Sequence, residues 1–207
     1  MIRRWLLSSG LMIASIALCA QTDYQLRLQA ERDSVDQVFR NEETSILREE
    51  DRAAFEGLNY FPIDENWKVE AAFQKIKRGK AFKMKTTTDR LPVYKPYGTA
   101  TFVINGQSFT LTIYQNLDLM KREGFEDYLF IPFTDETNYE ETYAGGRYMD
   151  LRIGEIRDGK VVIDFNTCYN PYCAYNHKYS CPIPPSENHL KIRVLAGVMA
   201  APFGEKH

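Results

Sequence analysis

The pattern of apolar and polar positions divides the chain into a helical N-terminal part and a longer part with strand character. Between residues 22 and 56, apolar side chains recur at roughly helical spacing among many charges, with a break near Asn41–Ser45. Ser45 is followed by an apolar pair and then by Glu49-Glu50-Asp51, which indicates the start of a second short helix. Gly57 is a stop signal, so we expect two helices with a solvated charged face.

Strand patterns begin after Pro62. Lys68–Ile76 alternates between apolar and polar side chains, and Asn105-Gly106 separates two further alternating runs, which is a strong hairpin signal. A turn at Arg157–Lys160 predicts a second hairpin over Gly146–Phe165. The strands expected are 68–76, 81–87, 97–104, 108–114, 128–133, 147–153, 161–165 and 190–195.

Short connections without intervening helices favour antiparallel pairing of these strands. We therefore expect one α+β domain over residues 22–200. Its N-terminal helical segment packs on a mainly antiparallel β-barrel or β-sandwich, and a long loop rich in Pro, Cys and Tyr covers it.

The first 20 residues have the features of a signal peptide. Two arginines precede the apolar stretch Trp5–Leu18, and polar sequence begins at Gln21. The apolar stretch is too short to span a bilayer comfortably, and no later run is long enough. We expect an exported protein, periplasmic or secreted. The alternative is lipidation at Cys19, which would tether the chain to a membrane, although Leu18 is an unusual residue before a lipidated cysteine.

The amino-acid composition limits the classes of partner that the chain is expected to bind. The 207-residue chain is 44% hydrophobic and 26% charged, which is typical of a globular protein. Its net charge of −2 provides no basic field, so we expect no nucleic-acid partner. Aromatic residues make up 13% of the chain and suit a ring-stacking ligand such as a sugar. The sequence leaves the oligomeric state open.

The segment 164–190 differs from the rest of the chain. It contains four of the nine prolines, three of the four cysteines and two of the three histidines. The prolines exclude a regular strand or long helix there. A long ordered loop on a rigid sheet is a common place for a binding site, although it can equally serve as a plug over the end of the sheet.

Three cysteines lie in this loop. Cys173 and Cys181 are eight residues apart and are expected to form a disulfide, because paired cysteines of exported proteins oxidise. A metal site using Cys173, His177 and Cys181 is an alternative, but it lacks the usual paired spacing. Free thiols are the third possibility, and Cys168 is expected to be buried. We predict no metal and no cofactor.

Several long motifs resemble one known family. The run Asn170-Pro-Tyr-Cys-Ala-Tyr175 is followed by Cys181-Pro-Ile-Pro-Pro-x-Glu187-Asn188-x-Leu190. Together with the runs Arg52–Pro62, Phe130–Asp135 and Glu141–Leu151, these motifs resemble the bacterial and archaeal family called domain of unknown function 1684. The resemblance covers about residues 24–197 and implies no specific activity, because the family is uncharacterised. Cys168 and His177 lie outside its pattern.

Polar residues on the late strands suggest a site. Alternation places Arg147 on one face of its strand and Tyr148 and Asp150 on the other. If the second predicted hairpin forms, Asp164 or Asn166 lies near Arg147. The candidate ligand-binding residues are Arg147, Tyr148, Asp150, Asp164, Asn166, Asn170, Tyr175 and Glu187. The alternative is an internal ion pair between Arg147 and Asp150, Asp164 or Glu187 that pins the loop.

Three functional hypotheses remain open. The first is an exported protein that binds a small polar ligand in a pocket under loop 164–190. The second is a hydrolase that uses Asp150, Asp164 or Glu187 as acid and base, although the chain contains no familiar nucleophile motif. The third is a structural or assembly module without a ligand.

Overall fold

The first helix begins at a capping signal. In the computed structural model, which describes residues 21–201, α1 (Asp23–Arg40) follows Thr22. The Thr22 hydroxyl accepts the Gln25 N–H at 3.2 Å, and the Gln25 side chain accepts the Thr22 N–H at 3.0 Å. This reciprocal pair satisfies backbone donors that a helix start leaves open. The second predicted helix is present as the short α2 (Glu49–Ala53), which starts after Ser45.

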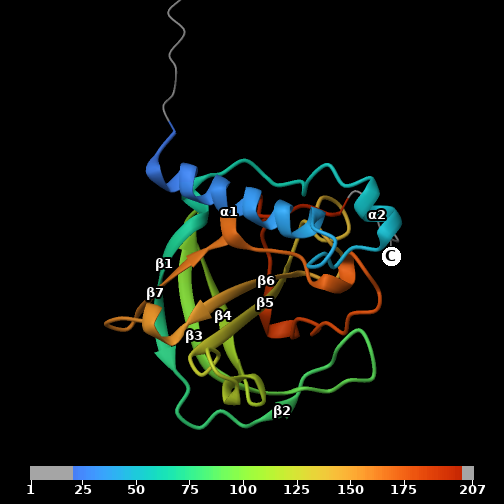
Figure 1. Ribbon diagram of the computed structural model, residues 1–207. Helices are drawn as coiled ribbons and strands as arrows, with labels where there is room; N and C mark the ends of the chain where they lie inside the picture. Colours follow the sequence, from blue (N-terminus) through green and yellow to red (C-terminus); the bar gives the residue numbers. More distant parts are fainter. Residues whose placement is uncertain (1–20, 202–207) are drawn as a thin grey trace, which may run out of the picture.

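The remaining elements form a curled, mainly antiparallel half-barrel (Figure 1). Within the described residues, the sheet has eight strands in the order β6-β5-β4-β3-β1-β7, with β2 beside β3 and β8 parallel to β5. The strands are β1 (Lys68–Lys75), β2 (Phe82–Lys83), β3 (Val93–Ile104), β4 (Gln107–Asn116), β5 (Tyr128–Asp135), β6 (Arg147–Arg152), β7 (Lys160–Asp164) and β8 (His189–Leu190). Short 3₁₀ turns lie before and between the strands, three of them in the segment that links β7 to β8: η1 (Glu65–Trp67), η2 (Leu119–Lys121), η3 (Ile153–Glu155), η4 (Phe165–Thr167), η5 (Tyr172–Ala174) and η6 (Ser186–Asn188).

The hairpin predicted at Asn105-Gly106 is confirmed. Ile104 pairs with Gln107, and β3 and β4 continue antiparallel from that turn. Both turn residues have positive φ, 52° for Asn105 and 78° for Gly106. Asn and Gly adopt this conformation readily, and it matches the twist of the two strands.

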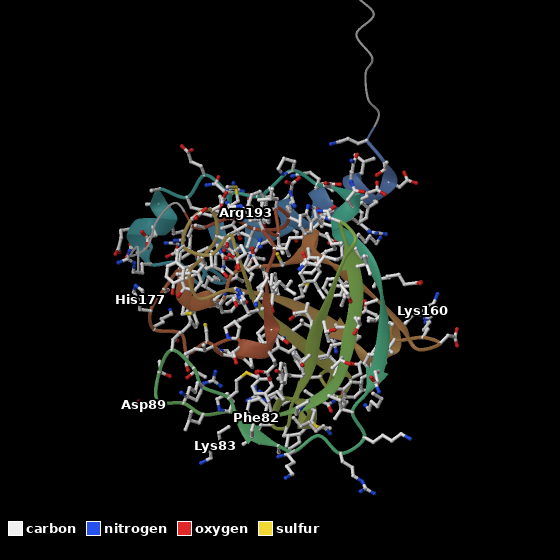
Figure 2. All side chains as sticks on the ribbon, turned by 180° about the vertical axis from the view of Figure 1, so that it is seen from behind. Phe82, Lys83, Asp89, Lys160, His177 and Arg193 are labelled. Atoms are coloured by element: carbon white, nitrogen blue, oxygen red, sulfur yellow. The ribbon has the colours of Figure 1, made fainter. Side chains whose placement is uncertain are left out.

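The hairpin predicted over Gly146–Phe165 is wrong. Strands β6 and β7 lie at opposite ends of the sheet order, where β6 pairs with β5 and β7 pairs with β1. The turn itself does form, because Arg157 and Lys160 exchange backbone hydrogen bonds of 3.0 and 2.8 Å. Turn chemistry therefore specifies the reversal of the chain, whereas pairing across the curled sheet decides which neighbour β7 takes. Figure 2 places Lys160 at the sheet edge, on the opposite side of the molecule from His177.

The concave side of the half-barrel holds the main core. Val161, Ile163 and Phe165 point inward, as their alternation predicts, and pack with Phe102 and Phe133. Helix α1 lies across one end of the sheet (Figure 1) and buries Leu28, Arg32 and Phe39. None of the helices in residues 21–201 is long and apolar enough to span a membrane. The expected signal peptide and the lipidation candidate Cys19 lie outside the described residues.

Candidate ligand site

Arg147 belongs to the core rather than to a ligand pocket. Its side chain is fully buried on the core face of β6. One guanidinium nitrogen, Nη2, donates to Asp135 Oδ2 at 2.8 Å and to the Val194 carbonyl at 2.9 Å. The other, Nη1, donates to the Ala196 carbonyl at 2.6 Å. An internal ion pair was one of the expected outcomes, but its partner is Asp135 and not Asp150, Asp164 or Glu187.

The three predicted carboxylates do not converge on Arg147, and a tyrosine hydroxyl donates to each of them. Glu187 accepts the Tyr114 hydroxyl at 2.7 Å, beside β4. Asp164 accepts the Tyr24 hydroxyl at 2.8 and 3.0 Å, where α1 meets the end of β7. Asp150 lies on the outer face of β6. The polar pocket predicted around Arg147, Asp164 and Glu187 is therefore absent from the described part of the chain.

Two of the predicted asparagines position loops. Asn166 accepts the Asp64 N–H at 3.1 Å and donates to the Asp64 carbonyl at 2.9 Å, as a neighbouring strand would. Asn170 donates to the Met199 carbonyl at 2.9 Å and to the Tyr175 hydroxyl at 3.3 Å. These bonds tie loop 164–190 to the segments on either side of it.

A cavity of about 640 Å³ lies between α1, the outer face of β5 and β6, and the first half of the loop. We call it the tyrosine cleft. Five of the eight predicted site residues line it: Tyr148, Asp150, Asn166, Asn170 and Tyr175. The cavity lies under the loop where the sequence led us to expect a ligand pocket, and its lining is more aromatic than the sequence suggested. The rings around it are those of Phe39, Tyr60, Tyr94, Phe125, Tyr128, Phe130, Tyr148, Tyr169, Tyr172 and Tyr175.

Asp150 is held in this cleft by two phenols. Tyr128 and Tyr169 each donate to Asp150 Oδ1 at 2.6 Å. Among the described residues, no protein group donates to Oδ2 of this carboxylate. Burial, and next the charge of Asp150, raises the pKa of Tyr128, so its hydroxyl stays protonated and remains a donor into the alkaline range. The geometry presents one oriented carboxylate oxygen among aromatic rings.

Sequence reasoning missed Tyr128 and Tyr169. Tyr128 pairs with Arg152 on the neighbouring strand, so its ring lies diagonally across from Asp150. Tyr169 reaches β6 through a two-way backbone bridge to Tyr148, with hydrogen bonds of 2.9 and 3.0 Å. The strand alternation of Tyr128 was a usable signal, whereas the Tyr169 contact depends on the path of the loop.

Apolar side chains stay exposed around the mouth of the tyrosine cleft. Folded proteins usually bury such groups, and a cluster of them marks a place where something else binds. The members and their exposed fractions are Val35 39%, Val38 46%, Phe125 38% and Tyr172 49%.

The expected disulfide is not present. Cys168, Cys173 and Cys181 are all free and buried, and no pair of sulfurs is at bonding distance. Cys173 and Cys181 are nevertheless neighbours, since the Cys173 N–H donates to Cys181 Sγ at 3.2 Å. Among residues 21–201, no three ligating side chains gather as a metal site would require.

The fold and site together define a curled antiparallel half-barrel with an aromatic cleft under a long loop. The chain belongs to the family described as protein of unknown function, DUF1684, whose model matches residues 53–199. It is similar to an uncharacterised protein of Haloarcula marismortui whose structure was determined by solution NMR. The two share 35% identity and a TM-score of 0.66, over 86% of this chain and 94% of the other. Comparison with the curated proteins finds no match.

Proposed function

We propose that the protein binds a small, ring-bearing ligand in the tyrosine cleft and recognises it by a donor group at Asp150. The observation that carries the proposal is the pair of 2.6 Å phenol hydrogen bonds to Asp150 Oδ1. They orient the carboxylate and leave its second oxygen for a ligand. Preorganised polar groups in an apolar cleft are the usual basis of small-molecule recognition.

The charges around the cleft favour a ligand with an ammonium or hydroxyl group over an anion. Asp150 and Glu31 line the cleft. The cation that lines the cleft, Arg32, is engaged by the Phe61 carbonyl at 3.1 Å and by the Tyr60 ring at 4.3 Å. An anionic ligand would be repelled by the Asp150 carboxylate, and the unpartnered Nε of Arg32 is buried and not exposed to it.

The proposal is tested by titrating isotope-labelled protein with three probes and following amide shifts. Tyramine and 4-hydroxyphenylacetate share a ring and differ in the sign of their charge, and methyl glucoside supplies hydroxyls on a sugar ring. We expect tyramine or methyl glucoside to shift cleft residues, and 4-hydroxyphenylacetate to bind more weakly. Asp150→Asn should weaken tyramine binding by about 10-fold or more, since a charged hydrogen bond contributes roughly 1.5–3 kcal/mol.

The control is Asp89→Asn, which removes a carboxylate that does not line the cleft. It should leave every titration unchanged. Tightest binding of the anionic probe, or shifts of equal size in the wild type and Asp150→Asn, would contradict the proposal.

The other two hypotheses receive less support. Asp150 and Asp164 line a second hollow of about 560 Å³, which is where a pair of hydrolytic carboxylates would have to act. Asp164, however, already accepts the Tyr24 hydroxyl and the Asn166 backbone and side-chain N–H groups, the latter two at 3.1 Å each. An assembly module would need no oriented carboxylate in a cleft. We also retain export as a proposal, on the features of residues 1–20.

A further inference from the structure

The two neighbouring cysteines lie in the wall between two cavities. A second cavity, of about 610 Å³, opens between β5, the 136–145 loop and the proline-rich part of loop 164–190. We call it the thiol cleft, because Cys173 lines it. Cys181 lines the tyrosine cleft instead, and Tyr148, Pro171 and Pro182 line both. The two cysteines therefore lie in a wall between the cavities, each lining one of them, and they are 4% and 6% exposed.

Hydrogen bonds hold the wall between the two cavities in place. The Tyr148 hydroxyl donates to the Pro182 carbonyl, next to Cys181. Thr87 holds the same segment with two hydrogen bonds. Its N–H donates to the Cys181 carbonyl at 2.9 Å, and its hydroxyl accepts the Cys181 N–H at 3.1 Å. The cysteines are thus placed by their surroundings, without a covalent bond between them.

The surroundings of the two sulfurs differ. The Tyr143 hydroxyl lies 3.8 Å from Cys173 Sγ, inside the thiol cleft. The hydrogen bond from the Cys181 thiol lowers the pKa of Cys173; burial opposes it, smaller contributions from the hydroxyls of Tyr143 and Thr87 add to it, and the resulting pKa is about 7. Donating that hydrogen bond raises the pKa of Cys181. This arrangement favours the thiolate form of Cys173, which accepts the hydrogen bond, and the thiol form of Cys181, which donates it.

We propose that Cys173 and Cys181 form a thiol–disulfide exchange centre whose substrate is a low-molecular-weight disulfide entering the thiol cleft. The Cys173 thiolate attacks one sulfur of the disulfide RSSR, forms a mixed disulfide with it and releases RS⁻. The Cys181 thiol then loses its proton to the released thiolate and attacks Cys173 Sγ. This step forms the Cys173–Cys181 disulfide and releases the second sulfur as RS⁻, which takes a proton from water, so that one thiolate and one thiol of the protein are oxidised as one RSSR is reduced to two RSH.

The third cysteine provides a built-in contrast. Cys168 is 1% exposed, donates to the Ala196 carbonyl at 3.5 Å, and has a pKa raised by burial. Cys168 also lines the tyrosine cleft, but it lacks both a neighbouring sulfur and a hydroxyl donor among the described contacts. It should stay unmodified as long as the protein is folded, so it reports on folding within the same experiment.

The test uses the full chain, oxidised glutathione as the probe disulfide, and peptide mass mapping. Wild-type protein should form the Cys173–Cys181 bond, and reduced glutathione should reverse it. Cys181→Ser should stop at a mixed disulfide on Cys173, whereas Cys173→Ser should react at least 10-fold more slowly. A mixed disulfide trapped on Cys181 would overturn the assignment, as would two unreacted thiols in folded wild type. A bridge that reduced glutathione does not open would identify a structural disulfide and also overturn it.

A second measurement tests the attacking role of Cys173 without relying on those variants. Alkylation of Cys173 by iodoacetamide should follow a titration with its midpoint near pH 7. Tyr143→Phe should move the midpoint upward and slow the reaction at pH 7 by up to about threefold. The expected change in rate is small because a lower pKa increases the fraction of Cys173 that is thiolate but also makes that thiolate a weaker nucleophile. Tyr97→Phe, at a ring that lines neither the thiol cleft nor the tyrosine cleft, is the matched control. A midpoint near 8.5 that Tyr143→Phe leaves in place would refute the proposal.

Discussion

Arg147 and Asp135 form an ion pair from which solvent is excluded completely, with 0% exposure of both side chains and an Nη2–Oδ2 distance of 2.8 Å. The carboxylate has further donors, since its Oδ1 accepts the Thr137 N–H at 2.9 Å and the Val194 N–H at 3.1 Å. The pair joins the ends of β5 and β6 to the extended segment at 194–198. Gly146 makes this approach possible, because its φ is +86° and a Cβ there would meet the Phe133 carbonyl oxygen at 2.4 Å.

The first prediction is that Arg147→Ala lowers the free energy of unfolding by about 3–5 kcal/mol, since it leaves the Asp135 carboxylate buried without its cation. Arg147→Lys should lose less, because an ammonium group keeps the charge but cannot reach all the carbonyls that the guanidinium holds. Urea denaturation at neutral pH measures both changes.

The control for this prediction is Arg193→Ala. Arg193 also pairs with acidic residues, Glu140 and Glu141, but its side chain is 41% exposed. We expect that variant to lose far less stability than Arg147→Ala, because exposed ion pairs are screened by solvent. Equal losses in Arg147→Ala and Arg193→Ala would contradict the role of Arg147 as the central connector of these segments.

The second prediction concerns Asn188, whose side chain takes the place of backbone hydrogen bonds between two strands. Its side chain is fully buried and accepts the Thr112 N–H at 2.8 Å. It also donates to the Thr112 carbonyl at 2.9 Å and the Pro132 carbonyl at 2.8 Å. It thus bridges β4 and β5, which pair directly only at Tyr114 and Phe130. Asn188→Ala should cost about 3 kcal/mol in urea melts, because it strands buried backbone groups.

For Asn188→Asp, the direction in which stability changes with pH can be stated in advance. A carboxylate at this position would face two carbonyl oxygens, so the folded state should raise its pKa above the unfolded value of about 4. The native state then binds more protons than the unfolded state, and stability should fall as the pH rises above about 4. Asn188→Ala should lack this extra slope between pH 4 and 7, and parallel curves for the two variants would count against the bridge.

The third prediction concerns the anchor between α1 and the sheet. The Tyr24 hydroxyl donates to both oxygens of Asp164, and burial raises the pKa of this tyrosine, so the donor persists at neutral pH. Tyr24→Phe removes the donor and should cost about 1–2 kcal/mol. Hydrogen exchange should show the loss in the first turns of α1 before the strands are affected. Protection that changes equally throughout the chain would contradict this local effect.

The fourth prediction is a loss of stability in alkali. Burial raises the pKa of both Tyr148 and Tyr169. Above about pH 10 an unfolded tyrosine ionises while these two stay protonated in the native state. The unfolded state then binds fewer protons, so the free energy of unfolding should fall by about 1.4 kcal/mol per pH unit for each such tyrosine. Urea melts between pH 9 and 11 measure this slope.

Tyr148→Phe isolates the contribution of one ring. It should lower stability at every pH, since the bond to the Pro182 carbonyl is lost, and should also reduce the alkaline slope by the share of one tyrosine. Tyr139→Phe, at a ring that is 78% exposed, should leave the slope as it is. If both variants kept the wild-type slope, Tyr148 would not be one of the groups that resist ionisation.

The sequence by itself determined the features that depend on neighbours a few residues apart. The α1 start, the Asn105-Gly106 hairpin and the inward face of Val161 and Ile163 all follow from capping, turn and alternation rules. The motifs within 53–199 also identified the family. The placement of Arg147 opposite Tyr148 and Asp150 was correct for the same reason, because alternation within one strand is local.

Only the tertiary structure decided which of these faces meet. The curled sheet carries β7 to β1 instead of β6, and this separates Arg147 from Asp164 and gives it Asp135. Asp164 in turn takes its donor from Tyr24, 140 positions away. Turn chemistry states where the chain reverses but not which edge the next strand joins, because pairing energy is similar at either open edge. The burial of whole faces makes that choice, and it depends on every strand at once.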